Sequence, residues 1–180
     1  MSFCSDVRNE LARVIPEREC CRKAELLALL DSAATVDDAG DQGYVLKVRA
    51  ENAATARKIF KLIKESYSMP SSVSIENRRR FGKTRVYQVN TQISQDNLSI
   101  LQEFQLITAN NNNSKRQLNT YFTKACCKRA YLRGIFLSRG FINRPEGDYH
   151  LEIVFNDHKP AMQGQKMLER FNINMRSFER

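Results

Sequence analysis

Residues 126–140 have the sequence CCKRAYLRGIFLSRG, in which two adjacent cysteines precede an apolar run that ends at an arginine and a glycine. Residues 20–34, CCRKAELLALLDSAA, align with this stretch without a gap at a spacing of 106 residues. Both stretches carry small residues four positions apart, namely Ala24 and Ala28, and Ala130 and Gly134. Such residues lie on one face of a helix and let two helix axes approach closely. The pattern therefore predicts two repeated helices that pack against each other at these positions.

The repeat continues beyond these helices. Residues 43–50 and 148–155 alternate apolar and polar side chains, which predicts a half-buried strand in each copy. Residues 51–67 and 156–171 then carry apolar side chains at helical spacing, and Asn52 is a candidate N-cap for the first of these two helices.

The first copy is longer than the second. Residues 71–91 contain two β-rich runs joined by a basic turn at 79–83, which predicts a hairpin. Residues 92–107 are expected to form a helix with Ser94 as its N-cap. The second copy ends with residues 173–180, enough for one edge strand, so we expect an incomplete repeat within a longer chain.

These patterns divide the chain into four segments and predict its fold class. We expect an N-terminal helical arm at 1–19, a first repeat at 20–108, a polar linker at 109–119 and an incomplete second repeat at 120–180. A complete repeat has the order αββαββα, so the predicted fold class is α+β with two pseudo-symmetric repeats. We expect a monomer, because the twofold relation is internal.

Composition and charge limit the classes of function that the chain can have. An apolar content of 42% with 27% charged residues is typical of a globular protein. The N-terminus lacks the apolar core of a signal peptide, so we expect a cytoplasmic, nucleoid-associated protein with no membrane partner and with reduced thiols. The net charge is +9, and residues 111–180 carry 13 basic against 6 acidic side chains. Such an excess favours a polyanionic partner, most simply double-stranded DNA.

The duplicated order of helices and strands around a small-residue seam resembles the LAGLIDADG homing endonucleases. Residues 131–142, YLRGIFLSRGFI, are similar to the motif helix that names that family. More narrowly, five segments resemble the WhiA family of bacterial regulators: SDVRNELARV, CCRKAELLALL, ENAATARKIFKLIKESY, NRRRFGKTRVYQV and CCKRAYLRGIFLSRGFI. The resemblance implies antiparallel saddle sheets, a helix-turn-helix domain beyond residue 180, and a role in transcription regulation during sporulation or cell division.

The resemblance also bears on catalysis. Nucleases of this family place one carboxylate at the end of each motif helix, where the pair holds divalent cations for phosphodiester hydrolysis. Those positions are Ala33 and Arg139 here, and the earlier acidic position pairs Asp31 with Leu137. The aspartates at 37–38 are expected in a solvated turn. We therefore expect an inactive scaffold rather than an enzyme, in which Arg139 could contact phosphate or pair with Asp31.

Basic side chains define a candidate DNA surface. Strand alternation places Lys47 and Arg49 opposite Leu46 and Val48, on the open face of the expected saddle. Further candidates lie at the hairpin turn, in the linker and at the end of the second motif helix: Arg78, Arg79, Arg80, Lys83, Arg85, Lys115, Arg116 and Arg139.

The second copy favours an alternative function. Glu152 and Val154 stand where the first copy has Lys47 and Arg49, so the second sheet suits phosphate less well. The alternative is a docking module that binds other transcription proteins or modulates the separate helix-turn-helix domain.

The cysteine pairs do not have the spacing of a zinc site. Structural zinc sites usually separate their cysteines by two to four residues, whereas adjacent residues on a helix point about 100° apart. We expect one cysteine of each pair to be a small buried side chain near a helix start, and we expect no metal or other cofactor. His150 is expected to be exposed on a strand, opposite Leu151 and beside Glu152.

Overall fold

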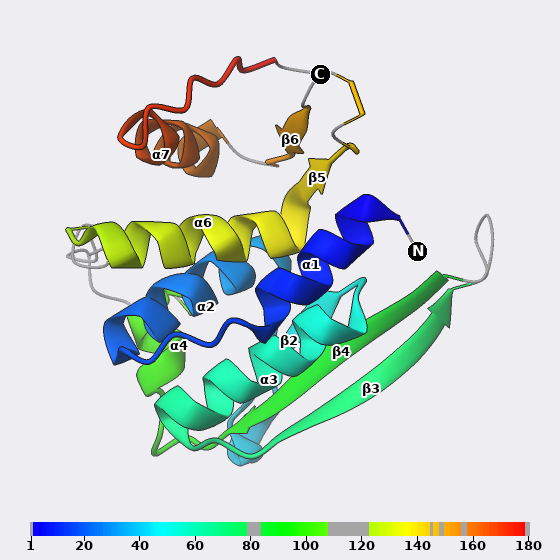
Figure 1. Ribbon diagram of the computed structural model, residues 1–180. Coiled ribbons are helices and arrows are strands. Elements are labelled where there is room, and N and C mark those ends of the chain that lie inside the picture. Colours follow the sequence, from blue (N-terminus) through cyan, green and yellow to red (C-terminus); the bar gives the residue numbers. More distant parts are fainter. Residues whose placement is uncertain are drawn as a thin grey trace.

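A computed structural model describes residues 2–78, 84–107, 123–144, 146–147, 150–155 and 158–178. The first part of the chain contains α1 (Phe3–Arg13), α2 (Glu19–Ala33), β1 (Ala34–Asp38), the short 3₁₀ helix η1 (Gly40–Gln42), β2 (Tyr44–Ala50), α3 (Ala53–Tyr67), β3 (Ser71–Arg78), β4 (Thr84–Ile93) and α4 (Ser99–Glu103). The second part contains α6 (Ala125–Arg139), β5 (Gly140–Ile142), β6 (Leu151–Ile153) and α7 (His158–Glu169) (Figure 1).

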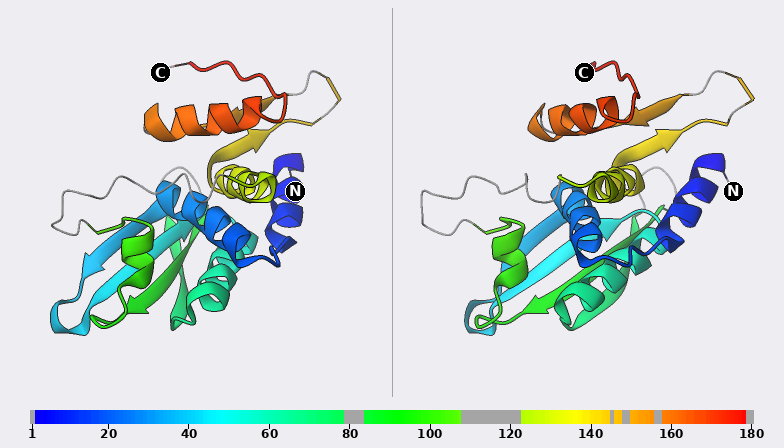
Figure 2. Two further views of the ribbon diagram at one scale, coloured as in Figure 1. Left: turned by 90° about the vertical axis from the view of Figure 1, so that its left-hand side faces the viewer. Right: turned by 60° about the vertical axis from the view of Figure 1, so that its left-hand side comes forward.

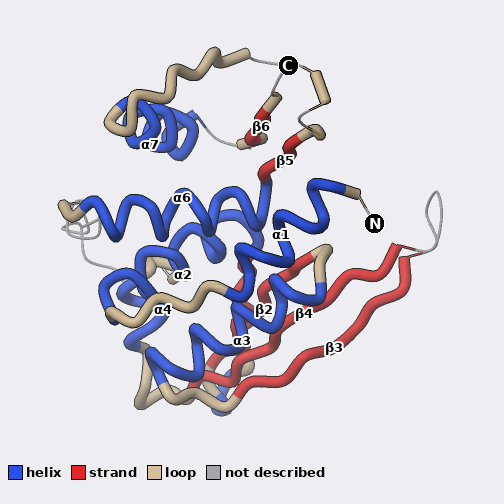
Figure 3. The backbone as a smooth tube through the Cα atoms, in the orientation of Figure 1, coloured by secondary structure: helices blue, strands red, loops and turns tan. Residues whose placement is uncertain are grey.

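The first repeat is built on a four-stranded antiparallel sheet in the order β1-β2-β4-β3. Alternation along β2 buries Leu46, Val48 and Ala50 beneath α2 and α3, which confirms the predicted half-buried strand. β3 and β4 form the predicted hairpin and extend beyond the helices that cover the rest of the sheet (Figure 3). The connecting turn at 79–83 lies outside the described residues.

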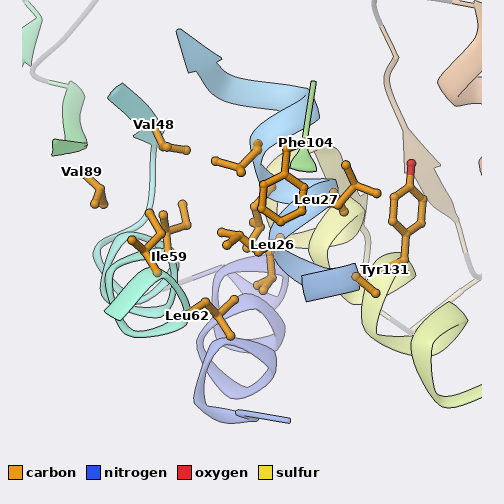
Figure 4. Packing of buried hydrophobic residues seen from close by; sticks show 14 of the residues in the cluster. Leu26, Leu27, Val48, Ile59, Leu62, Val89, Phe104 and Tyr131 are labelled. Carbon is orange, nitrogen blue, oxygen red and sulfur yellow. The ribbon is translucent and has the colours of Figure 1, made fainter. Parts of the chain in front are cut away.

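The core of the molecule surrounds α2. Buried residues occupy most positions of this helix from Cys21 to Leu30, because the sheet and α3 lie on one side and α6 lies on the other. Figure 4 shows Leu26 and Leu27 among the side chains of this core, with Ile59 and Leu62 from α3 and Tyr131 from α6 nearby. A helix that is buried on nearly all sides depends on both repeats for its stability.

Local sequence signals explain where α3 and α6 begin and end. Asn52 caps α3 as predicted, since its Oδ1 accepts hydrogen bonds from the backbone N–H groups of Ala54 and Thr55 at 2.7 and 3.3 Å. α6 ends at Arg139, and Gly140 begins β5, in agreement with the end of the apolar run in the sequence.

The second repeat forms a separate layer on the other side of α6 (Figure 2). Its sheet consists of β5 and β6, paired antiparallel, with α7 close to α6. The N-terminal helix α1 joins the two parts, because Nη2 of Arg8 donates a hydrogen bond to the carbonyl of Gly140 at 2.6 Å and the same helix packs on α3. Within the described residues, no helix is both long enough and apolar enough to cross a bilayer.

Three expectations from the sequence are wrong. Residues 92–107 do not form one helix, because β4 continues to Ile93, which pairs with Tyr44 and is buried; α4 begins only at Ser99, and Ser94 does not cap it. The aspartates at 37–38 belong to β1 rather than to a turn. The described residues 173–178 form no strand, since they have no neighbouring strand with which to pair.

Candidate nucleic-acid interface

The face of the four-stranded sheet that α2 and α3 do not cover is called the open face here. Strand alternation and the observed register place Lys47 opposite Asn90 and Arg49 opposite Gln88 on this face. β3 adds Ser72 and Ser74 to the same face. The open face is therefore lined by cationic, amide and hydroxyl side chains.

Hydrogen bonds order the polar side chains of the open face. Nε2 of Gln88 donates to Oδ1 of Asn90 at 2.7 Å, and Nδ2 of Asn90 donates to Oγ of Ser74 at 3.0 Å. Nζ of Lys47 lies 2.5 Å from Oδ2 of Asp37 on β1, whereas Arg49 is exposed. Amide groups can pair with base edges and cations can pair with phosphates, so both kinds of group needed for contact with nucleic acid are present.

The structure separates the basic residues predicted at the hairpin. Arg85 is exposed, but it pairs with Asn77 and has the same parity along β4 as the core residue Val89, so alternation places it on the helix side of the sheet. The backbone of Arg78 ends β3. The remaining candidates of this group, and those of the linker, lie outside the described residues: Arg79, Arg80, Lys83, Lys115 and Arg116.

The two positions predicted to correspond to the nuclease carboxylates lie where α2 and α6 end. Ala33 is the last residue of α2, and Arg139 is the last residue of α6. Nη2 of Arg139 donates to the carbonyl of Ser32 at 2.7 Å, and Nη1 lies 3.5 Å from the carbonyl of Val154. Arg139 thus links the C-terminal end of α2 to the second repeat.

The contact between α2 and α6 is called the repeat seam here. Ala24, Ala28, Ala130 and Gly134 are all buried in the two helices that form it. A Cβ atom at Gly134 would lie 2.6 Å from the carbonyl oxygen of Glu25 and 2.8 Å from Cβ of Ala28. Gly134 and Ala28 are equivalent positions of the repeat, so the helices run side by side with matching residues in contact (Figure 1).

A buried group of charges crosses the repeat seam. Glu25, which is 0% exposed, pairs with Nζ of Lys58 on α3 and accepts two hydrogen bonds from Arg133 on α6, at 2.7 and 2.9 Å. Nζ of Lys58 also donates to the carbonyls of Leu11 and Val14, at 2.9 and 2.7 Å. Burial lowers the pKa of Lys58, and the nearby Glu25 carboxylate opposes that shift. This charged group was not predicted from the sequence, although Glu25 is a single acidic residue within the apolar run of residues 24–30.

The cysteine pairs meet at the other end of the repeat seam, where α2 and α6 begin. Cys21 and Cys127 are buried, as expected, and their Sγ atoms lie 3.9 Å apart. Burial raises the pKa of Cys21 to about 11 and also raises the pKa of Cys127. A hydrogen bond with Cys21 lowers the pKa of Cys126.

The second sheet presents a different surface. Glu152 of β6 lies 3.9 Å from Nε2 of His150, whose side chain is exposed as predicted. Val154 and Phe141 are exposed apolar residues of this repeat. This surface therefore lacks the ordered amide and cation pairs of the open face in its described residues.

Comparisons with known proteins place the chain in a family. The family profile of the WhiA N-terminal LAGLIDADG-like domain matches residues 19–107, and that of the WhiA LAGLIDADG-like domain matches residues 128–180. A protein of Syntrophomonas wolfei named probable cell division protein WhiA is 50% identical over the whole chain, which covers 58% of that relative. One of Heliobacterium modesticaldum with the same name is 37% identical, and the chain covers 56% of it. The chain thus spans little more than half the length of these relatives.

Solved structures agree on the fold. The crystal structure of the N-terminal LAGLIDADG domain of DUF199/WhiA aligns with 99% of this chain and 79% of its own, at a TM-score of 0.70 and 23% identity. The homing endonuclease I-DmoI, in complex with DNA and Mn, aligns with 87% of this chain and 81% of its own, at a TM-score of 0.56 and 15% identity. The architecture is therefore that of the LAGLIDADG fold, and the chain belongs to the WhiA family.

Proposed function

We propose that this domain binds duplex DNA through the open face of its first repeat and does not cut it. The observation that carries the proposal is the ordered row of Gln88, Asn90 and Ser74 beside Lys47 and Arg49 on an uncovered sheet face. The solved I-DmoI complex supports DNA binding, because a protein of this fold was crystallised with DNA. In a protein of the length of its relatives, the domain would act in a transcription regulator together with a helix-turn-helix domain.

The cationic side chains of the open face would contact phosphates, and the ordered amide side chains would contact bases. Arg49 is exposed and free to approach phosphate, whereas Lys47 must exchange Asp37 for phosphate at little cost, since an exposed ion pair contributes only about 0–1 kcal/mol. Gln88, which is only 9% exposed, already holds the partly exposed Asn90 in position, so contacts of Asn90 with bases would lose less side-chain entropy on binding. This arrangement suits moderate affinity that depends on salt.

The absence of cutting follows from the residues at the ends of the motif helices. Alanine at 33 has no ligand atom, and the Arg139 guanidinium would repel a divalent cation. Arg139 also donates to the carbonyl of Ser32, which keeps a positive charge at the position where the nuclease chemistry needs two carboxylates. The domain would therefore keep the nuclease architecture as a DNA-binding scaffold.

The test is binding of the chain to a fluorescent duplex at two salt concentrations. If about three phosphates are neutralised, the affinity should fall roughly 40-fold between about 50 and 200 mM salt. The variant K47A/R49A should bind more weakly, and the charge-matched variant K166A/R176A, which removes two exposed cations of the second part of the chain, should bind like the parent. An absence of binding even at the lower salt concentration would overturn the proposal, and magnesium-dependent cleavage would overturn its second part.

A second candidate function is protein docking, and one observation favours it. Val73 and Ile75 of the edge strand β3 are 44% and 58% exposed, although they share the apolar face of the sheet with Val89 and Tyr87. An exposed apolar edge can pair with another chain. If V73S/I75S abolished association with a partner protein while the parent chain failed to bind DNA, docking would replace DNA binding as the function.

A further inference from the structure

Four cysteines converge where α2 and α6 begin. Cys20 and Cys21 belong to the first turn of α2, and Cys126 and Cys127 belong to the first turn of α6. The Sγ atoms of Cys20, Cys21 and Cys127 all lie within 4.8 Å of one another. Cys126 lies beside Cys127 at the start of α6, and interaction with Cys21 lowers the pKa of its thiol. Three of the thiols therefore form one cluster across the repeat seam, and Cys126 adjoins it.

Parallel packing of the repeated helices explains the cluster. Adjacent side chains on one helix diverge by about 100°, yet the Sγ atoms of Cys20 and Cys21 lie within 4.8 Å of each other and of Sγ of Cys127. The parallel helices bring equivalent residues together, as Cys127 meets Cys21. The thiols are therefore brought together by the packing of equivalent residues 106 positions apart, and not by the spacing of cysteines within one helix.

The distances between the sulfur atoms suit a tetrahedral metal site. With Zn–S bonds of about 2.3 Å, the sulfur atoms of a tetrahedral site are about 3.8 Å apart. The distance between Cys21 and Cys127 is 3.9 Å. A disulfide requires about 2.05 Å between the same atoms, which is a much larger displacement. The Sγ atom of Cys20 lies within 4.8 Å of both of these sulfur atoms.

The surroundings suit a negatively charged thiolate complex. The N-caps of α2 and α6 are Arg18 and Lys124, and neither forms a side-chain capping hydrogen bond, so backbone N–H groups at both helix starts are available to thiolates. Nη1 of Arg18 lies 3.9 Å from Sγ of Cys126. A metal bound by four thiolates carries a net charge of −2, which these groups would partly balance.

We propose that Cys20, Cys21, Cys126 and Cys127 form a site for one Zn²⁺ ion that fastens α2 to α6. Ligand sets made only of cysteine select soft or borderline ions, and Zn²⁺ is the ion that such sets hold in tetrahedral geometry. Binding releases one proton from each thiol and involves no change of oxidation state. The ion closes the repeat seam at the end opposite Arg139.

The first experiment is titration of the metal-free, reduced chain with Co²⁺ without oxygen. Tetrahedral cobalt thiolates have strong visible absorption, which should saturate at one ion per chain and disappear when an equivalent of Zn²⁺ is added. The variant C21S/C127S should lose this absorption, and so should C20S/C126S, which changes the two partly exposed thiols and is the safer variant for folding. The matched control is C4S, because Cys4 is buried outside the cluster.

Thermal melting gives an independent reading on the unaltered chain. Free Zn²⁺ at 100 times its Kd should raise Tm by roughly 5–10 °C for a chain of this size, and a chelator should reverse the rise. Failure of the folded, fully reduced chain to bind Co²⁺ stoichiometrically would overturn the proposal, and so would equal binding by C20S/C126S. Formation of a bond between Cys21 and Cys127, detected by mass spectrometry with loss of metal binding, would assign the cluster to redox chemistry instead.

Discussion

In the first repeat, α2 leads into four strands with a continuous apolar side and an ordered polar side. In the second repeat, the equivalent helix α6 leads into two short strands, and Phe141 and Leu151 remain exposed. The helices themselves match closely, since Cys21 meets Cys127 and Ala28 meets Gly134. The two repeats therefore share the repeat seam but differ in their sheets. Because the core around α2 contains side chains from both repeats, stability depends on both, whereas DNA contact is expected from the first repeat.

The largest loss of stability is expected from removing the carboxylate of the buried charged group, which consists of Glu25, Lys58 and Arg133 and connects the two repeats. Glu25→Ala leaves the amine of Lys58, which is 0% exposed, without its carboxylate, so the free energy of unfolding should fall by about 3–5 kcal/mol. Denaturant unfolding followed by circular dichroism measures the loss. The double variant E25L/K58M should lose less than E25A alone, because no unpaired charge stays buried. A loss under about 1 kcal/mol for E25A would mean that the seam does not depend on this group.

The close approach at the repeat seam should give the next effect. Gly134→Ala places a Cβ atom 2.6 Å from the carbonyl oxygen of Glu25, so the helices must separate. We expect a loss of about 1–3 kcal/mol in the free energy of unfolding. Gly147→Ala is the matched control, because a Cβ atom there meets nothing within 4 Å. Equal stability of the two variants in thermal melts would contradict the described seam.

Removing the cations of the open face should weaken DNA binding with little effect on stability. K47A/R49A should raise Kd roughly tenfold, equal to about 1.4 kcal/mol, and should make the slope of log K against log salt shallower by about 2. Fluorescence anisotropy over a range of salt measures both. If the control K166A/R176A weakened binding equally, nonspecific charge rather than the open face would carry the interaction.

Arg139→Ala should cause the smallest loss in the free energy of unfolding. It removes the hydrogen bond from Nη2 to the carbonyl of Ser32 at a partly exposed site, which we expect to cost about 1 kcal/mol of unfolding free energy. Differential scanning calorimetry measures the change. A gain of magnesium-dependent DNA cleavage in this variant would mean that Arg139 alone suppresses the nuclease reaction.

The sequence predicted the seam region well because its signals are local and repeated. The CC pairs, Asn52 and the alternation at Leu46 and Val48 each depend on one helix or strand, and the structure has those elements as expected. The extension of β4 to Ile93 was missed because pairing with β2 outweighs the local helical pattern. Helix propensity is weak against such tertiary contacts.

The candidate sites were harder to predict. Arg85 was grouped with Lys47 and Arg49, yet the register of β3 and β4 sets it on the other face. Lys58 is buried beside Glu25, and no pattern in the sequence predicted this pair. Both depend on which elements become neighbours, which periodicity alone does not specify. The grouping of the cysteines could have been predicted, since helices packed in parallel bring equivalent positions together.

We propose that the first repeat, and not the second, carries the DNA surface. Two-dimensional NMR of the chain titrated with a short duplex tests this directly. Backbone amide signals of β2 and β4, including those of Lys47, Arg49 and Asn90, should shift progressively while those of β5, β6 and α7 stay in place. Shifts confined to β5, β6 and α7, or no shifts at low salt, would contradict it.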